Sequence, residues 1–172
     1  MLIAEVLDVE TIDGFINDPA IFPDLGFDPN SAAVSAASFV GRPDYVFAGN
    51  AEAMMLFHRE PRGWHKHNMF KASCRGRKAL DAGRDLLGWF SLRHPGKSLF
   101  AETPLWNRKA RWFNRQIGFH STGFRDHPIV GETRSVGLIG AIELSNDKAK
   151  RGRFRESGRV GTSAAIIASR PD

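Results

Sequence analysis

The chain has 172 residues, and 42% of them are hydrophobic, which is enough for the core of one domain. No stretch approaches the ~20 consecutive apolar residues of a membrane-spanning helix, and the first residues lack the basic start of a signal peptide. The net charge of +5 is concentrated at the C-terminal end, since residues 145–172 hold seven basic residues against three acidic ones. We therefore expect a nearly neutral domain over residues 1–144 and a basic tail over residues 145–172.

The N-terminal part of the chain alternates between regular segments and a turn-rich loop. Residues 2–7 form a short apolar run that predicts a strand, and residues 9–17 carry apolar side chains at helical spacing. Residues 18–31 are rich in Asp, Pro, Asn and Gly, which is typical of a loop. Residues 32–40 are small and apolar and fit either a strand or a helix. We favour a strand.

Three strands and a long helix follow. Tyr45–Ala48 and Ala53–His58 flank a Gly49-Asn50 turn and predict an antiparallel hairpin, and Trp64–Ala72 adds a third strand after a second turn. Arg77–Leu92 has apolar residues at helical spacing around a broad face. This pattern favours a helix packed on a sheet.

The next part of the chain adds a second long helix and three more strands. Residues 98–101 predict a short strand, and Pro104 fits the first turn of a helix over residues 104–117. Residues 119–124 and 136–144 predict the last two strands. The order is strand, helix, three strands, helix, strand, helix and two strands, which predicts an α/β fold with a mixed sheet.

A basic turn lies between the third strand and the first long helix. It places Arg75, Arg77 and Lys78 around Gly76, at the start of the helix. Because the backbone N–H groups and the dipole of a helix N-terminus attract anions, these residues favour a phosphate site. A solvated basic turn is the alternative interpretation, since most charged runs lie on solvated surfaces.

The stretch from Ala101 to Phe119 carries the most informative pattern of the chain. Its residues recur as Asn, Ala, aromatic, Asn, Gly and Phe, at Asn107, Ala110, Phe113, Asn114, Gly118 and Phe119. This pattern resembles the late motif of the GNAT superfamily, the Gcn5-related N-acetyltransferases. The superfamily's earlier motif is Arg or Gln, two residues, Gly, one residue, then Gly or Ala. Here Arg75 fits its first position, whereas Lys78 and Leu80 stand at its fourth and sixth.

The resemblance covers residues 2–144 and implies a GNAT-like fold, with a central, mostly antiparallel twisted sheet flanked by helices. It also implies acetyl-CoA as the cofactor and acetyl transfer to an amine, which would attack the thioester directly. The residues that it assigns to cofactor binding are Phe70, Ala72, Arg75, Gly76, Arg77, Lys78, Ala79, Asn107 and Ala110. The tyrosine that often serves as general acid in the superfamily corresponds to Asn114, and an amide does not act as such an acid. The sequence does not specify the acceptor amine.

Candidate bases lie on the predicted second and third strands. Glu60 follows the second strand, and His65 and His67 share one face of the third, so each is a catalytic candidate alongside Asn114. Histidine is also a common metal ligand. No third ligand stands at a suitable spacing, and we therefore expect no metal site.

A second function, of a different class, is binding or assembly by a GNAT-like protein with weak or no catalysis. The segment Asp18–Pro23, the basic turn and the helix that begins at Asn107 also resemble small GNAT-like proteins of tailed bacteriophages. Some of those are virion or internal proteins. The departures at Lys78, Leu80 and Asn114 favour this function, and the sequence leaves open whether the chain is an enzyme.

The sequence also carries expectations about location and partners. The single cysteine, Cys74, excludes an internal disulfide and fits the cytoplasm of a bacterial host, with a phage particle as the further location in the second case. We expect no membrane partner, and Val136–Leu144 could join two copies of the chain or a larger assembly. The charge run Lys148–Arg159 fits a disordered tail, or an arm that binds nucleic acid or an acidic protein surface.

Overall fold

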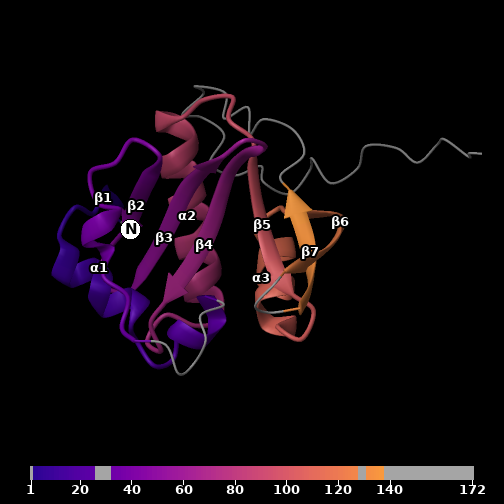
Figure 1. The fold of residues 1–172 in the computed structure, drawn as a ribbon, viewed down its shortest axis with the longest axis horizontal. Helices are drawn as coiled ribbons and strands as arrows, with labels where there is room; N and C mark the ends of the chain where they lie inside the picture. Colours follow the sequence, from indigo (N-terminus) through magenta and orange to yellow (C-terminus); the bar gives the residue numbers. More distant parts are fainter. Residues whose placement is uncertain (1, 26–31, 128–130, 138–172) are drawn as a thin grey trace, which may run out of the picture.

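The computed structural model describes residues 2–25, 32–127 and 131–137. Its centre is a seven-stranded sheet with the strand order β1-β2-β3-β4-β5-β7-β6 (Figure 1). Neighbouring strands are antiparallel except β4 and β5, which are parallel. The predicted α/β class, the mixed sheet and the order of long helices and strands are confirmed. In chain order the elements are β1 (Ala4–Glu5), α1 (Val9–Ile16), η1 (Phe22–Leu25), η2 (Ala36–Ser38), β2 (Tyr45–Gly49), β3 (Ala53–Glu60), β4 (Gly63–Phe70), α2 (Arg77–Arg93), β5 (Leu99–Pro104), α3 (Arg108–Gln116), β6 (His120–His127) and β7 (Gly131–Gly137).

The helix α1 covers one face of the sheet. Asp8 caps it, because the Asp8 carboxylate accepts the backbone N–H of Thr11 at 2.8 Å. Apolar residues of α1 and of the strands β2, β3 and β4 then pack together. The buried members of this cluster are Ile12, Phe15, Ile16, Ile21, Ala36, Phe47, Met54 and Met69.

The helix α2 covers the opposite face, next to α3. Trp64 and Phe70 of β4 pack on the α2 side and Met69 packs on the α1 side, as strand alternation predicts. Gly83 of α2 lies against α3, since a Cβ at this position would stand 2.6 Å from Cζ of Phe113. The close approach of the two helices therefore depends on a glycine.

The strands β4 and β5 start together and then separate. They pair at Trp64↔Leu99 and His65↔Phe100, and below this point in Figure 1 the two ribbons diverge. The divergence has a local cause, because the backbone N–H of Glu102 donates to Nε2 of His65 at 3.3 Å. A side chain thus accepts a hydrogen bond that a strand carbonyl accepts in a continuous ladder. The His65 ring stacks on Phe100 with 4.6 Å between centroids and fills the point of separation.

The strand predicted over residues 32–40 is wrong. The segment contains the short 3₁₀ helix η2 instead. The Asp13 carboxylate accepts the backbone N–H of Ala36 at 2.6 Å, and the Ser35 hydroxyl accepts that of Ala37 at 3.3 Å. Because side chains accept these backbone N–H groups, the segment forms a helical turn and pairs with no strand of the described sheet.

The second long helix starts later than the sequence analysis predicts. Pro104 is the last residue of β5 and not the first turn of a helix. The Asn107 side chain accepts the backbone N–H of Ala110 at 3.0 Å, so α3 begins at Arg108. The tryptophan Trp106, expected on the helix, precedes it and is 59% exposed.

Several predicted features lie outside the described residues. The last described strand, β7, begins at Gly131, five residues before the strand predicted over 136–144, and is described as far as Gly137. Residues 138–144, the boundary near residue 145 and the basic tail fall beyond that point. None of the helices in the described ranges has both the length and the apolar character needed to cross a lipid bilayer.

Candidate functional site

A cleft opens where β4 and β5 diverge, with a cavity volume of about 690 Å³, a size that suits a bound small molecule. Five parts of the chain line it: the segment after α1, the strand β4, the start of α2, the strand β5, and α3. Its lining includes Asp24, Lys66, His67, Asn68, Phe70, Arg75, Gly76, Ala79, Ala101, Thr103, Asn107, Ala110, Phe113 and Asn114. We call this space the β4–β5 cleft.

The N-terminus of α2 forms one end of the cleft. Gly76 caps this helix with φ 60° and ψ −131°, a backbone conformation that side chains other than hydrogen rarely allow. No side chain caps the helix at this position, so its first-turn N–H groups can meet an anion. The Arg75 guanidinium donates to the carbonyl of Phe70, which ties the basic turn to the end of β4.

The residues predicted to bind a cofactor divide into two groups. Six of them line the cleft, namely Phe70, Arg75, Gly76, Ala79, Asn107 and Ala110. The other three, Ala72, Arg77 and Lys78, lie outside its lining. Lys78 forms an ion pair with Glu52 at 2.6 Å, and Arg77 is 93% exposed and lies 3.8 Å from Asp81. The basic turn therefore presents its backbone and Arg75 to the cleft, while its other cations pair elsewhere.

Asn107 joins the two sides of the cleft. Its Oδ1 accepts the N–H of Ala110 at 3.0 Å, and its Nδ2 donates to the carboxylate of Asp24 at 3.0 Å. The residue is 8% exposed. It thus fixes α3 against the segment that follows α1, and the small side chain of Ala110 leaves space one turn further on.

A buried lysine is among the residues that line the cleft. Lys66 is 2% exposed, and its Nζ donates to Oδ1 of Asn114 at 2.7 Å and to Oδ1 of Asn68 at 2.9 Å. The Nδ2 of Asn114 in turn donates to the hydroxyl of Thr103 at 3.0 Å. Burial lowers the pKa of Lys66 to about 7, because desolvation disfavours the charged amine. The sequence analysis did not single out Lys66.

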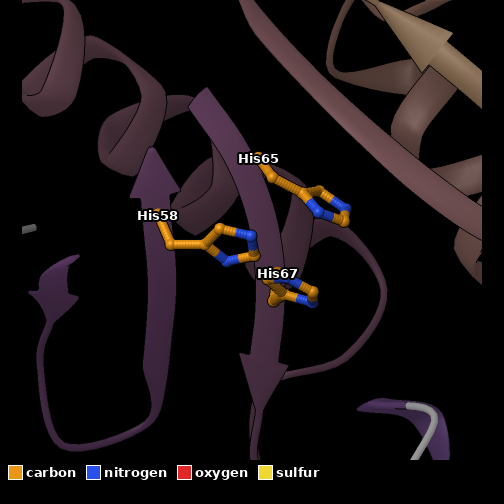
Figure 2. Close-up of side chains that lie close together, drawn as sticks. All are labelled: His58, His65 and His67. Atoms are coloured by element: carbon orange, nitrogen blue, oxygen red, sulfur yellow. The ribbon is translucent and has the colours of Figure 1, made fainter. Parts of the chain in front are cut away.

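Three histidines meet on the other face of β4 (Figure 2). His65 and His67 come from β4 as predicted, and the third, His58, comes from β3 opposite His65. Their ring nitrogens lie within 4.8 Å of one another. The sequence analysis missed His58, although counting back from the Pro61-Arg62 turn pairs Glu60 with Gly63 and therefore His58 with His65.

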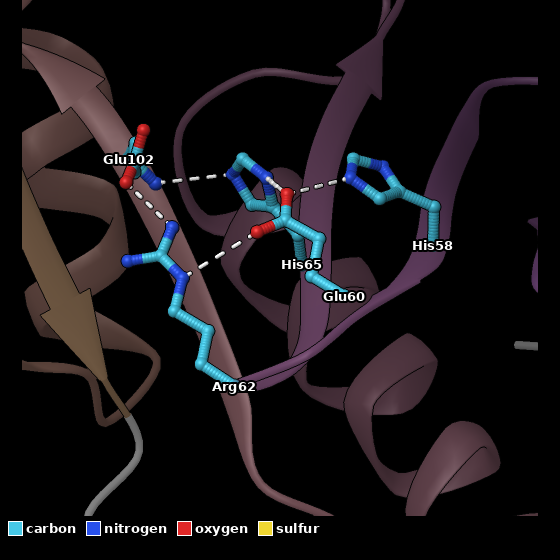
Figure 3. Close-up of polar contacts among 5 residues, drawn as sticks. All are labelled: His58, Glu60, Arg62, His65 and Glu102. Carbon is cyan, nitrogen blue, oxygen red and sulfur yellow. Dashed lines mark hydrogen bonds and ion pairs between the residues drawn. The ribbon is translucent and has the colours of Figure 1, made fainter. Parts of the chain in front are cut away.

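Glu60 links this cluster to β5 (Figure 3). One Glu60 oxygen lies 2.9 Å from Nε2 of His58 and 3.1 Å from Nδ1 of His65, and Arg62 forms ion pairs with both Glu60 and Glu102. Since Nε2 of His65 accepts the N–H of Glu102, its Nδ1 carries the proton and donates to Glu60. A metal ion bound through His65 would have to break one of these two contacts.

His67 is the member of the cluster that lines the cleft. Its burial, together with the neighbouring His65 and His58, holds the pKa of His67 well below its usual value. The imidazole is therefore neutral at pH 7 and able to accept a proton. Of the four catalytic candidates from the sequence, His67 and Asn114 line the cleft, while Glu60 and His65 lie outside its lining.

No protein-family model matches the chain. A diaminobutyrate–2-oxoglutarate transaminase of Halomonas elongata is 43% identical over 49 residues, and a putrescine–pyruvate aminotransferase of Pseudomonas aeruginosa is 52% identical over 33 residues. These stretches cover 28% and 19% of this chain, which spans only 10% and 7% of the two relatives. Matches over such short stretches assign this chain to no family.

Solved acetyltransferases share the fold along most of the chain. A spermidine N-acetyltransferase of Vibrio cholerae, in complex with CoA and spermine, has a TM-score of 0.64 at 10% identity and covers 79% of this chain and 93% of its own. An aminoglycoside acetyltransferase in complex with coenzyme A has a TM-score of 0.60 at 15% identity, with 79% and 94% covered. A ribosomal-protein-S5-alanine acetyltransferase of Vibrio fischeri has a TM-score of 0.59 at 10% identity, with 78% and 90% covered. The chain therefore has the fold of the GNAT acetyltransferases, as its late motif predicted.

Proposed function

We propose that the chain transfers an acetyl group from acetyl-CoA, consumed as a substrate, to an amine. The observation that carries this proposal is the separation of β4 from β5, which opens a cleft from the N-terminus of α2 to both faces of the sheet. The uncapped helix start at Gly76 and the side chain of Arg75 suit the diphosphate of the nucleotide. The small residues Ala79 and Ala110 leave room for a narrow chain between α2, α3 and β4. This fit rests on the residues themselves and on no bound molecule.

The face of β4 that carries His65 and His67 suits the acceptor amine. A neutral amine forms a bond to the thioester carbonyl, and the nitrogen must then lose a proton. His67 accepts this proton, since it lines the cleft as a neutral imidazole. A base with a lowered pKa suffices, because an amine nitrogen becomes far more acidic once it bonds to the carbonyl carbon. Glu60 and His65 hold the neighbouring rings in place.

Binding of acetyl-CoA tests the proposal directly. We expect acetyl-CoA to raise the melting temperature of the full chain and to bind measurably by calorimetry, since a ligand specific for the native state stabilises it. Ala110→Phe places a ring in the cleft and should abolish this binding. Ala37→Phe, an exposed position outside the cleft, is the matched control and should bind as the parent chain does. No thermal shift at millimolar acetyl-CoA would refute the proposal.

A screen of amines identifies the acceptor. Release of the free thiol of CoA is followed with spermidine, an aminoglycoside, free amino acids and peptides with free N-termini or lysines. The alternative function, assembly of a phage particle by a protein of this fold without catalysis, is favoured by the departures at Lys78, Leu80 and Asn114. It predicts a chain that binds a macromolecular partner and releases no thiol with any amine.

A further inference from the structure

The buried ammonium group of Lys66 requires an explanation. Among the described residues no carboxylate forms an ion pair with Lys66, and its hydrogen-bond partners are two amide oxygens. Its Nζ also lies 4.7 Å from the ring centroid of Phe119 and 5.8 Å from that of Phe113. Burying an ammonium group without a counter-charge is strongly unfavourable. A side chain kept at such a cost inside a ligand cleft is a candidate for function.

The position of Lys66 along β4 fits the reacting end of an extended ligand. Phe70, to which Arg75 is tied, lies four residues further on, at a distance of about 13 Å for the ordinary rise of a strand. Lys66 and His67 are consecutive, so their side chains leave opposite faces of β4. Both line the cleft. A group bound between β4 and β5 would therefore meet an ammonium group on the α3 side and an imidazole on the α1 side.

Asn114 fixes the direction of the ammonium group. Because Nδ2 of Asn114 donates to Thr103, its oxygen points toward Lys66 and accepts one of the three Nζ protons. Asn68 accepts a second. The third N–H can donate to a ligand in the cleft. Two neutral acceptors orient the lysine without raising its pKa as a carboxylate would.

We propose that Lys66, oriented by Asn114, is the general acid that protonates the departing thiolate of CoA. The inference rests on the proposed function. In this step the acceptor nitrogen has bonded to the carbonyl carbon, the carbon–sulfur bond breaks, and the electron pair stays on sulfur. The Lys66 ammonium group gives its proton to that sulfur, and the resulting neutral amine regains a proton from solvent. A pKa of about 7 suits proton donation near neutral pH.

The experiment compares Lys66→Met with the parent chain, using an amine that the thiol-release screen identifies. We expect kcat to fall by about 100-fold or more, as for the loss of a general acid, while the Kd for acetyl-CoA changes less than threefold. The parent chain should lose activity as the pH rises above about 7, where Lys66 loses its proton, and Lys66→Met should lack this fall. Lys97→Met, which removes an exposed lysine, is the control and should match the parent.

Asn114→Asp provides a second readout that a merely structural lysine would not give. A carboxylate beside Nζ raises the pKa of Lys66, so the fall in activity should move to higher pH by one unit or more. Unchanged kcat and an unchanged pH profile in Lys66→Met would overturn the inference while leaving the proposed function intact. If Lys66→Met does not fold, an unmoved profile in Asn114→Asp overturns it. If the parent chain binds no acetyl-CoA, the proposed function fails first.

Discussion

At the scale of single residues, Lys66 sets the pH dependence of stability. Its pKa falls to about 7 in the folded chain, against an ordinary value near 10.4 in an unfolded chain. Between these values the unfolded state binds one proton more than the folded state. Stability therefore rises with pH over this range. The whole shift corresponds to roughly 5 kcal/mol, which is lost progressively as the pH falls from about 10.4 to about 7.

Unfolding in urea between pH 6 and pH 10 tests this dependence. We expect the difference in unfolding free energy between the parent chain and Lys66→Met to grow in favour of the parent by up to about 1.4 kcal/mol per pH unit above pH 7. A constant difference across the range would mean that Lys66 keeps an ordinary pKa. The exposed Lys97→Met variant corrects for the general loss of one positive charge.

The sequence predicts some residues of the site and not others, for reasons that are local. The motif in the sequence includes Asn107 and Gly118, and in the structure Asn107 caps α3 while Gly118 follows it with φ 102°. The sequence analysis did not single out His58 and Lys66, since their roles arise from partners on neighbouring strands. His58 is recoverable from hairpin register. Lys66 is not, because only the packing of α3 places Asn114 beside it.

At the scale of elements, contact between α2 and α3 forms a wall of the cleft. Gly83→Ala places a methyl group 2.6 Å from Phe113 Cζ and 3.4 Å from Ile117 Cγ2. Overpacking of this kind costs about 1–3 kcal/mol, against a gain of about 1 kcal/mol in helix propensity. We therefore expect Gly83→Ala to destabilise the chain in urea unfolding, and to weaken acetyl-CoA binding by moving α3.

Gly88→Ala is the matched control in the same helix. A Cβ at Gly88 meets nothing within 4 Å, so only the propensity term applies and the variant should gain up to about 1 kcal/mol. Equal effects of the two substitutions would show that the contact between α2 and α3 is looser than the distances indicate.

Helices and strands followed from the sequence where periodicity is long enough to read. The stripe of α2 and the alternation of β4 predicted both the element and its buried side. The predictions of a strand over residues 32–40 and of a helix start at Pro104 were wrong, because the conformation of these residues depends on other parts of the chain. Asp13, a helix away, caps Ala36, and no local pattern reports such a contact.

At the scale of the whole molecule, the sheet separates two kinds of chemistry. The face beneath α1 holds the histidine cluster and Glu60, and the face beneath α2 and α3 holds Lys66 and Asn114. The faces communicate where β4 and β5 diverge, because the described pairing of these two strands ends after Trp64↔Leu99 and His65↔Phe100. An ammonium group and an imidazole can thus approach one group in the cleft from opposite faces of the sheet. The His65 ring, held by Glu102, keeps this opening in place.

The distribution of charge predicts a separate role for the end of the chain. Residues 145–172 carry +4 of the net charge of +5, and we propose that they bind nucleic acid or an acidic protein surface. The full chain should bind single-stranded DNA with an affinity that falls as salt rises from 50 to 200 mM, with a log–log slope of about 0.7 per neutralised phosphate.

A chain ending at residue 144 should lose this binding and keep its thermal shift with acetyl-CoA. Replacing Lys148, Lys150, Arg151 and Arg153 by Gln preserves the length and should weaken binding in the same direction. DNA binding that survives truncation would place the basic surface elsewhere, and a truncated chain that fails to fold would show that the domain extends past residue 144.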